Sequence, residues 1–138
     1  MDAETRVRLE LAAEFRTALR RFLRRTKVVA ARHGLTTERY DLLLMIKAAP
    51  SEHSTVTELC ESLQLRQTAV TELVKRAEDA GLVTREQSQR DARVSLLALT
   101  PEGDRRVLET WEELREDRRA FGAVFEDVRR RFRAWSGS

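Results

Sequence analysis

The chain has 138 residues, of which 41% are hydrophobic and 36% are charged, against roughly 25% charged residues in an average globular protein. Its length fits one domain with a sizeable core, and its few glycines and prolines, five and two, favour a mostly helical structure. The single cysteine excludes an internal disulfide framework, and the sequence has neither a secretory signal nor an apolar run long enough to span a membrane, so we expect a cytoplasmic protein without a membrane partner.

Positive charge is concentrated in one part of the sequence. The formal net charge is only +3, but residues 16–48 hold nine Lys/Arg against two Asp/Glu, whereas residues 97–138 hold nine of each. All but three of the cations are arginines, whose planar fork matches phosphates and base edges. This balance fits a nucleic-acid partner, although an arginine-rich chain is as typical of a GC-rich genome.

Four helices are predicted in the first 80 residues. Apolar residues recurring every three or four positions predict a long helix over residues 4–32, in which Arg16, Arg20 and Arg24 form a solvated face. Thr36 is the expected N-cap of a second helix, which ends at Pro50.

Thr55 and Glu58 have the spacing of a capping box, which predicts the start of a third helix. A fourth helix is predicted over residues 66–80, and Gly81 ends it. Its expected buried stripe is Ala69, Val70, Leu73, Val74 and Ala77.

A hairpin and two more helices complete the pattern. The segments "VTR" and "VSLLALT" are typical of strands around the polar loop "EQSQRDAR". Thr100 and Pro101 then open a helix with the stripe Val107, Leu108, Trp111 and Leu114, which we expect to break near "FGA" before a last helical segment. The fold class is therefore mostly α with a small β-hairpin, in the order α-α-α-α-β-β-α-α.

The third and fourth helices are separated by only two or three residues, so they are expected to cross steeply as a helix-turn-helix. The outer face of the fourth helix carries side chains that bind base edges and phosphates, with an ordinary solvated face as the alternative. These candidate DNA-binding residues are Arg66, Gln67, Thr68, Thr71, Lys75 and Arg76, and Thr55 at the start of the third helix joins them.

The hairpin that follows this helix has the place of a wing. Its loop carries Arg90 and Arg93 around Asp91, and a wing arginine suits the narrow, negative minor groove. Free Asp91 would be repelled by DNA, so its expected role is to orient an arginine. A surface loop with an incidental ion pair is the alternative.

In order and spacing, these segments resemble the MarR family of winged helix-turn-helix regulators from about His33 to Gly103. The stretches that carry the resemblance are "HGLT", "TVTELCESLQL", "TAVTELVKRAEDAGLVTR" and "RDARVSLLALTPEG". The resemblance implies one MarR-type domain over residues 1–138, with dimerisation helices at 4–33 and 101–135 and a winged helix-turn-helix DNA-binding lobe at 36–100.

The resemblance also implies an obligate homodimer on a pseudo-palindromic DNA site. The apolar stripes over residues 7–29 and 107–135 agree, because they are too long for so small a lobe to cover. Asp91 and Arg93 match the family's wing pair, and Thr68, Thr71 and Arg76 match its recognition-helix contacts. The expected dimer contacts are Val7, Leu11, Phe15, Trp111, Phe121, Phe125, Phe132 and Trp135.

The chain departs from the family pattern at three positions. Gln64 stands where glycine is common, so a left-handed residue there would be strained. Arg66 stands where Ser or Asp often caps the fourth helix, and Ala77 stands where leucine is usual.

Three further residues, Cys60, His33 and Tyr40, could have either a functional role or an ordinary role in packing. Cys60 is expected to pack in the core, although some family members sense peroxides through a cysteine. Family members bind small aromatic or phenolic effectors where His33 and Tyr40 lie, so these are candidate ligand residues, with ordinary packing as the alternative. The two histidines are too scattered for a metal site.

No nucleophile elbow, phosphate loop or metal-spaced cluster occurs, so we expect neither an enzyme nor a cofactor. The prediction is a dimeric, sequence-specific, double-stranded DNA-binding transcription regulator of bacterial type, more often a repressor than an activator in this family and released by an effector. The alternatives are a winged helix used for protein–protein contact and a nonspecific nucleoid binder.

Overall fold

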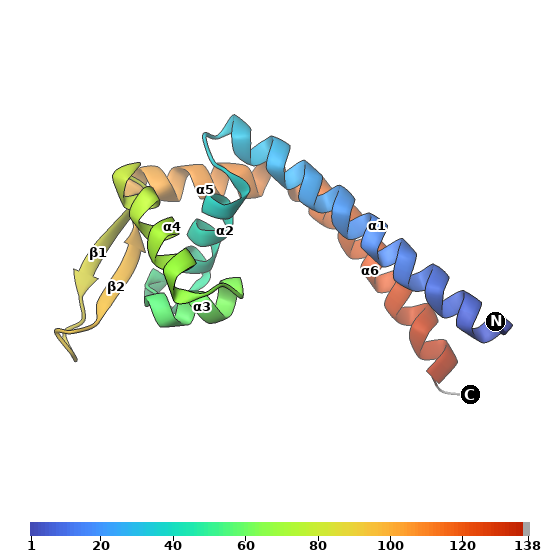
Figure 1. Cartoon of the computed structure of the whole chain (residues 1–138). Coiled ribbons are helices and arrows are strands. Elements are labelled where there is room, and N and C mark those ends of the chain that lie inside the picture. The colour runs from blue at the N-terminus through green and yellow to red at the C-terminus, as the bar shows by residue number, and fades with distance from the viewer. Residues whose placement is uncertain (137–138) are drawn as a thin grey trace. The chain divides into compact units, whose positions relative to one another are not determined.

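The computed structural model describes the backbone of residues 1–136 and the side chains of residues 1–134, so the predicted dimer contact Trp135 lies outside the described side chains. The order of elements confirms the predicted fold class, with a short 3-10 helix, η1, added (Figure 1). In chain order the elements are α1 (Ala3–Arg32), α2 (Thr37–Ala48), η1 (Pro50–Glu52), α3 (Val56–Leu63), α4 (Gln67–Asp79), β1 (Val83–Gln87), β2 (Ser95–Leu99), α5 (Pro101–Glu113) and α6 (Arg115–Ser136).

The chain divides into two compact units. The first, the paired-helix unit, comprises Met1–Val29 and Glu112–Ser138, and the second, the winged unit, comprises Ala30–Trp111. Each unit has its own apolar interior, because both contain fully buried side chains such as Leu11 in the first and Leu42 in the second.

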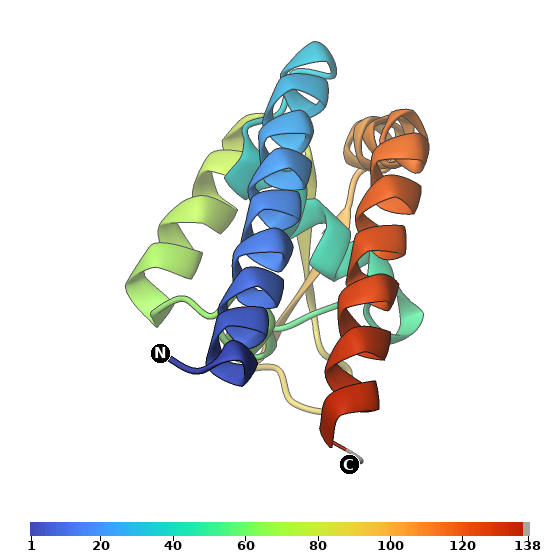
Figure 2. The same ribbon diagram turned by 90° about the vertical axis from the view of Figure 1, so that its right-hand side faces the viewer.

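In the paired-helix unit, α1 and α6 run side by side in opposite directions (Figures 1 and 2). Their apolar residues recur at helical spacing and meet along the seam, where the rings of Phe15 and Phe121 lie 5.9 Å apart and those of Phe22 and Phe121 stack at 5.4 Å. Arg25 and Asp117 add an ion pair of 3.1 Å across the same seam.

The expected helix break near "FGA" is wrong. The break falls at Leu114, between α5 and α6, and Gly122 lies inside the continuous helix α6. One glycine costs a helix only about 1 kcal/mol, which the packing of the neighbouring Phe121 and Phe125 against Phe15 offsets.

In the winged unit, α2 supplies the centre of the core. Leu42, Leu43 and Ile46 of this helix are fully buried, and α2 contacts α3, α4 and β2. Thr36 caps α2 as expected, since its hydroxyl accepts a hydrogen bond from the Arg39 amide at 3.1 Å.

The hairpin is antiparallel, with Val83 opposite Leu99 and Gln87 opposite Ser95. A third segment joins it, because Ser54 forms an isolated bridge with Leu97 through backbone hydrogen bonds of 3.0 and 2.7 Å. The sequence did not predict this bridge. At the far end of β2, Thr100 caps α5 as expected by accepting a hydrogen bond from the Gly103 amide at 3.1 Å.

Candidate nucleic-acid interface

Helices α3 and α4 are joined by a tight turn over residues 64–66. Gln64 adopts the left-handed conformation, with φ 54° and ψ 47°, in which a non-glycine residue is disfavoured. Its side-chain amide donates a hydrogen bond of 2.6 Å to the Glu61 carbonyl, which helps a non-glycine residue to hold this geometry. The Leu65 amide closes the turn on the Cys60 carbonyl at 3.1 Å.

The turn presents one polar face of α4 to solvent. Val70, Val74 and Ala77 are fully buried on the opposite face. Ala69, predicted to belong to the buried stripe, is exposed, because it lies at the edge of that stripe and its small side chain contributes little by burial. The exposed residues of the outer face are Arg66, Gln67, Thr68, Thr71, Lys75 and Arg76.

An acidic residue also lies on this face. Glu72 accepts a hydrogen bond of 2.8 Å from the Arg76 guanidinium, one helical turn away. Both side chains are about two thirds exposed, so the pair contributes little to stability and Arg76 can exchange Glu72 for a phosphate. The spacing of four residues would have allowed this pair to be predicted.

Arg66 begins α4 with N-cap backbone geometry but forms no side-chain cap hydrogen bond. Replacement of Arg66 by Ser is therefore expected to stabilise the protein by about 1 kcal/mol, because a serine hydroxyl can accept a free amide of the first turn. If Arg66 also contacts phosphate, the same variant binds DNA more weakly. Thermal unfolding measures the change in stability, and a DNA titration measures the change in affinity. A variant that neither gains stability nor loses affinity contradicts both roles.

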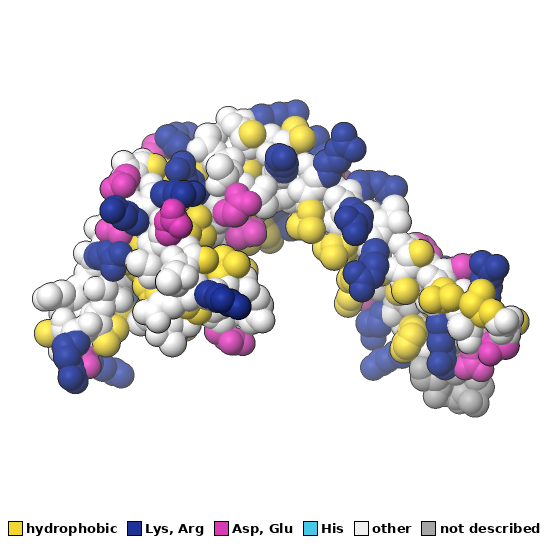
Figure 3. Space-filling view, viewed as in Figure 1, with side chains coloured by type: hydrophobic (Ala, Val, Ile, Leu, Met, Phe, Trp, Pro, Cys, Tyr) yellow, Lys and Arg dark blue, Asp and Glu magenta, His cyan; other side chains and the backbone are white. Residues whose placement is uncertain are grey.

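The wing loop places a fixed arginine in solvent. The Asp91 carboxylate accepts hydrogen bonds from the Arg93 amide at 3.0 Å and from the Arg93 guanidinium at 3.2 Å. The hydrogen bond from the Arg93 amide has the larger effect and the one from its guanidinium the smaller, and together they hold the pKa of the Asp91 carboxyl below its usual value. The Arg93 side chain is still 91% exposed, and Arg90 is exposed beside it. Basic side chains accordingly gather at the hairpin tip (Figure 3).

Thr55, the N-cap of α3, and Cys60, within that helix, are both half-buried. The Thr55 hydroxyl accepts the Glu58 amide at 3.1 Å, and the Glu58 carboxylate accepts the Thr55 amide at 3.1 Å, so the predicted capping box is confirmed. A free thiol remains at Cys60.

The two candidate effector residues lie in different surroundings within the winged unit. Tyr40 is 4% exposed and belongs to the core. His33 is half-buried, and its Nδ1 lies 3.2 Å from the Glu109 carboxylate. The burial of Tyr40 and the contact of His33 with Glu109 are typical of ordinary packing, the alternative interpretation of this pair.

Three of the expected dimer contacts have a large exposed fraction in the paired-helix unit: Val7 at 38%, Phe125 at 46% and Phe132 at 50%. Leu11 is only 1% exposed and is covered by its own chain, whereas Phe15 and Phe121 are half-buried and contact each other. Trp111, another expected dimer contact, lies in the winged unit and is 38% exposed, and Leu108 of the same predicted apolar stripe is 41% exposed.

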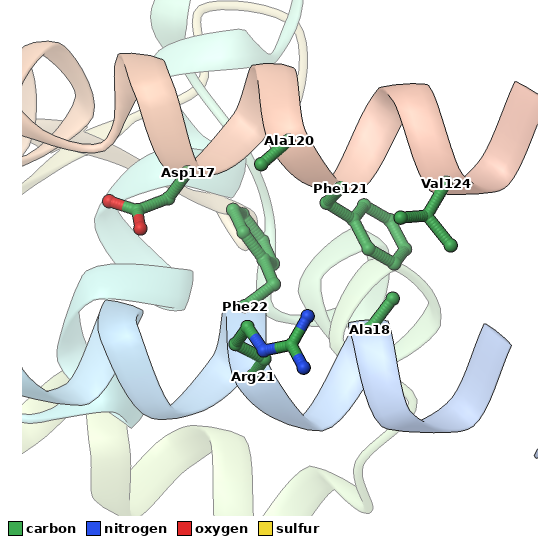
Figure 4. A pocket seen from close by; sticks show the side chains of 7 residues that line it. All are labelled: Ala18, Arg21, Phe22, Asp117, Ala120, Phe121 and Val124. Carbon is green, nitrogen blue, oxygen red and sulfur yellow. The ribbon is translucent and has the colours of Figure 1, made fainter. Parts of the chain in front are cut away.

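In the paired-helix unit, side chains from α1 and α6 surround a cavity of about 100 Å³ (Figure 4). Phe22 and Phe121 are directed toward each other in this cavity, and Asp117 lies near one end of it. Pockets for small organic ligands are typically about 300 Å³ or larger, so this cavity is too small for an aromatic effector.

Among the residues that the structure describes, no group of His, Cys, Asp and Glu has a geometry that could hold a metal ion. None of the described helices combines the length and the apolar character needed to cross a bilayer.

Comparisons with known proteins connect this fold to one family. Residues 33–94 match the model of the MarR family. No curated protein matches the chain. The chain is similar to the apo form of MarR from Escherichia coli, with 18% sequence identity and a TM-score of 0.67 over 84% of this chain and 79% of that chain.

Two further solved structures have the same fold. A mutant of Escherichia coli MarR complexed with operator DNA has 18% identity and a TM-score of 0.66, over 93% of this chain and 85% of that chain. BpsR of Bordetella bronchiseptica, whose DNA binding is regulated by 6-hydroxynicotinic acid, has 17% identity and a TM-score of 0.66, over 89% of this chain and 90% of that chain.

Proposed function

Residues 33–94 of this chain match the model of the MarR family, and from this premise we propose that the protein is a sequence-specific, double-stranded DNA-binding transcription regulator of the winged helix-turn-helix type. The observation that carries the proposal is the polar outer face of α4, followed in the same unit by a wing whose Arg93 is oriented by Asp91 and exposed to solvent. Gln67, Thr68 and Thr71 have the chemistry to bind base edges.

The basic candidate residues of α4 and of the wing have the chemistry to bind the negatively charged DNA backbone and grooves. Arg66, Lys75 and Arg76 would contact phosphates on either side of a major groove, and Arg93 would enter the adjacent minor groove. Lys75 supports this role, because it has no carboxylate partner within the described part of the chain.

A titration by fluorescence anisotropy tests the proposal, with duplex DNA from upstream of the protein's own gene beside a scrambled duplex at two salt concentrations. We expect the native duplex to bind about 1,000-fold more tightly and both affinities to fall steeply with salt, as counterions are released from phosphates. Equal affinities would indicate a nonspecific nucleoid binder, and no binding to either duplex would indicate a winged helix used for protein contact.

We further propose that the protein binds as a homodimer. Its two winged units would occupy one pseudo-palindromic DNA site, in two major grooves about one helical turn apart. Val7, Phe125 and Phe132 support it, because large apolar side chains exposed on one unit are typical of a surface that another chain covers. Repression is the form of regulation we propose, since a dimer bound across a promoter would exclude RNA polymerase.

We expect Arg93→Ala to weaken binding to the native duplex by about 1–3 kcal/mol, because the variant loses the wing's contact with the groove. Gln89→Ala, also exposed in the wing loop, is the matched control and should bind like the wild type. Anisotropy measures both affinities. If Arg93→Ala binds as tightly as Gln89→Ala, the wing has no part in recognition.

We also propose that a small-molecule effector releases the protein from DNA. A hollow of about 280 Å³ in the winged unit, near the lower end of the size range of small-ligand pockets, is lined by the charged side chains Glu38, Arg39, Glu72 and Arg76 and by the apolar Leu65 and Leu73. Its arginines and leucines offer the chemistry for a small aromatic acid. Addition of benzoate to the same titration tests release, and an affinity unchanged at millimolar benzoate would leave this ligand class without support.

A further inference from the structure

His53 lies between η1 and α3, and both of its ring nitrogens face a hydrogen-bond acceptor. Nδ1 is 2.6 Å from the Ser51 carbonyl oxygen, and Nε2 is 3.0 Å from the Glu86 carboxylate on β1. A neutral imidazole carries one N–H and can donate to only one of these acceptors, whereas the protonated ring donates to both. Only the charged ring can therefore satisfy both contacts as hydrogen bonds.

The charges around the ring favour the same form. His53 lines a hollow of about 460 Å³ together with the charged side chains of Lys47, Glu52, Glu86 and Asp104. The Lys47 ammonium is 2.6 Å from Asp104 and 3.0 Å from Glu52, so its charge is already compensated and carboxylates are in excess. The pKa of His53 is raised above its usual value, first by the hydrogen bond to the Ser51 backbone and next by that to Glu86.

The segment that contains His53 connects the wing to the helix-turn-helix through three consecutive residues. His53 contacts β1 through Glu86, and Ser54 bonds to β2 through Leu97. Thr55 then caps α3. The Ser54 bridge and the Thr55 cap do not depend on pH in the neutral range, so the contact between His53 and Glu86 is the titratable member of the three.

We propose that His53 and Glu86 form a proton-dependent clamp that fixes the root of the wing against the entry to α3, so that the protein holds DNA more tightly as His53 takes up a proton. Glu86 lies in β1 only four residues before Arg90, so fixing this strand restricts the position of the arginines in the wing loop. The effect on DNA affinity rests on the proposed function, whereas the clamp itself does not.

The direction of the pH dependence follows from the raised pKa of His53. The clamp is complete below the ordinary histidine pKa of about 6.5 and is lost as the pH rises through the higher value of the folded protein. Between pH 8 and pH 6, the affinity of the wild type for its duplex should therefore increase about threefold more than that of His53→Gln, as expected for a partly exposed ion pair.

Two further variants separate the clamp from a general effect of charge. His53→Lys keeps a cation at all these pH values and should bind tightly with the weak pH dependence of His53→Gln. Glu86→Gln removes the acceptor charge and should also lose the extra pH dependence, although His53 is intact. If the affinity ratio between pH 6 and pH 8 is the same in the wild type, His53→Gln and Glu86→Gln, the proposed effect on DNA affinity is wrong.

An NMR titration of the imidazole protons tests the clamp without DNA. The chain has only two histidines, so His33 gives the single reference signal. Glu86→Gln should lower the pKa of His53, and an unchanged His53 titration in this variant overturns the clamp. Failure of the protein to bind any duplex would instead overturn the proposed function, and the NMR result would still decide whether the clamp exists.

Discussion

Replacement of both Val7 and Phe132 by glutamate is expected to convert the protein to a monomer and to weaken its binding to the native duplex by about 100-fold. Both side chains are exposed, at 38% and 50%, and Val7 lines an open, mainly apolar hollow of about 620 Å³ between α1 and α6. Two glutamates on a surface that a second chain covers would be buried without partners, which strongly opposes association.

Light scattering measures the mass, and anisotropy measures the affinity. Arg119→Glu is the matched control, because it also places a glutamate on α6, at a side chain that is 72% exposed. The control should remain a dimer and bind DNA like the wild type. If the Val7 and Phe132 variant stays dimeric, these residues lie outside the interface, and if the wild type is itself a monomer, the proposed homodimer is wrong.

Most of the fold could be predicted because its signals are local. Helical periodicity located the helices, and the hydroxyls of Thr36, Thr55 and Thr100 marked three of their starts. η1 could not be predicted, since Ser51 and Glu52 both have φ 56°, a conformation that neither residue type favours. The break at Leu114 was missed because Gly122 is the stronger local signal, although side-chain packing keeps the helix continuous there.

The candidate site likewise contains features that local sequence signals predict and one contact that they do not. The exposed face of α4 follows from periodicity, and the bond between Asp91 and Arg93 follows from their adjacency in one loop. The contact between His53 and Glu86 joins residues 33 positions apart, and no local pattern indicates it. Such contacts arise only when η1 and the hairpin pack in the same unit.

The start of α5 gives the prediction with the largest expected effect on stability. Gly103 is buried in the first turn of α5, and a Cβ at this position would lie 2.1 Å from the carbonyl oxygen of Leu82. That oxygen is also the acceptor for the Thr100 amide at 3.0 Å, so the clash involves backbone that the chain cannot easily move. Gly103→Ala should therefore destabilise the protein by about 3 kcal/mol.

Thermal unfolding followed by circular dichroism measures this effect, and a loss of that size should lower the melting temperature by roughly 10 °C. Gly122→Ala is the matched control, since a Cβ there meets no atom within 4 Å and alanine favours the helix by up to about 1 kcal/mol. The two glycines both lie in helices, so opposite signs would show that the close approach to Leu82, and not helix propensity, requires Gly103. If Gly103→Ala melts at or above the wild-type temperature, the tight packing of α5 against the entry to β1 does not exist in solution.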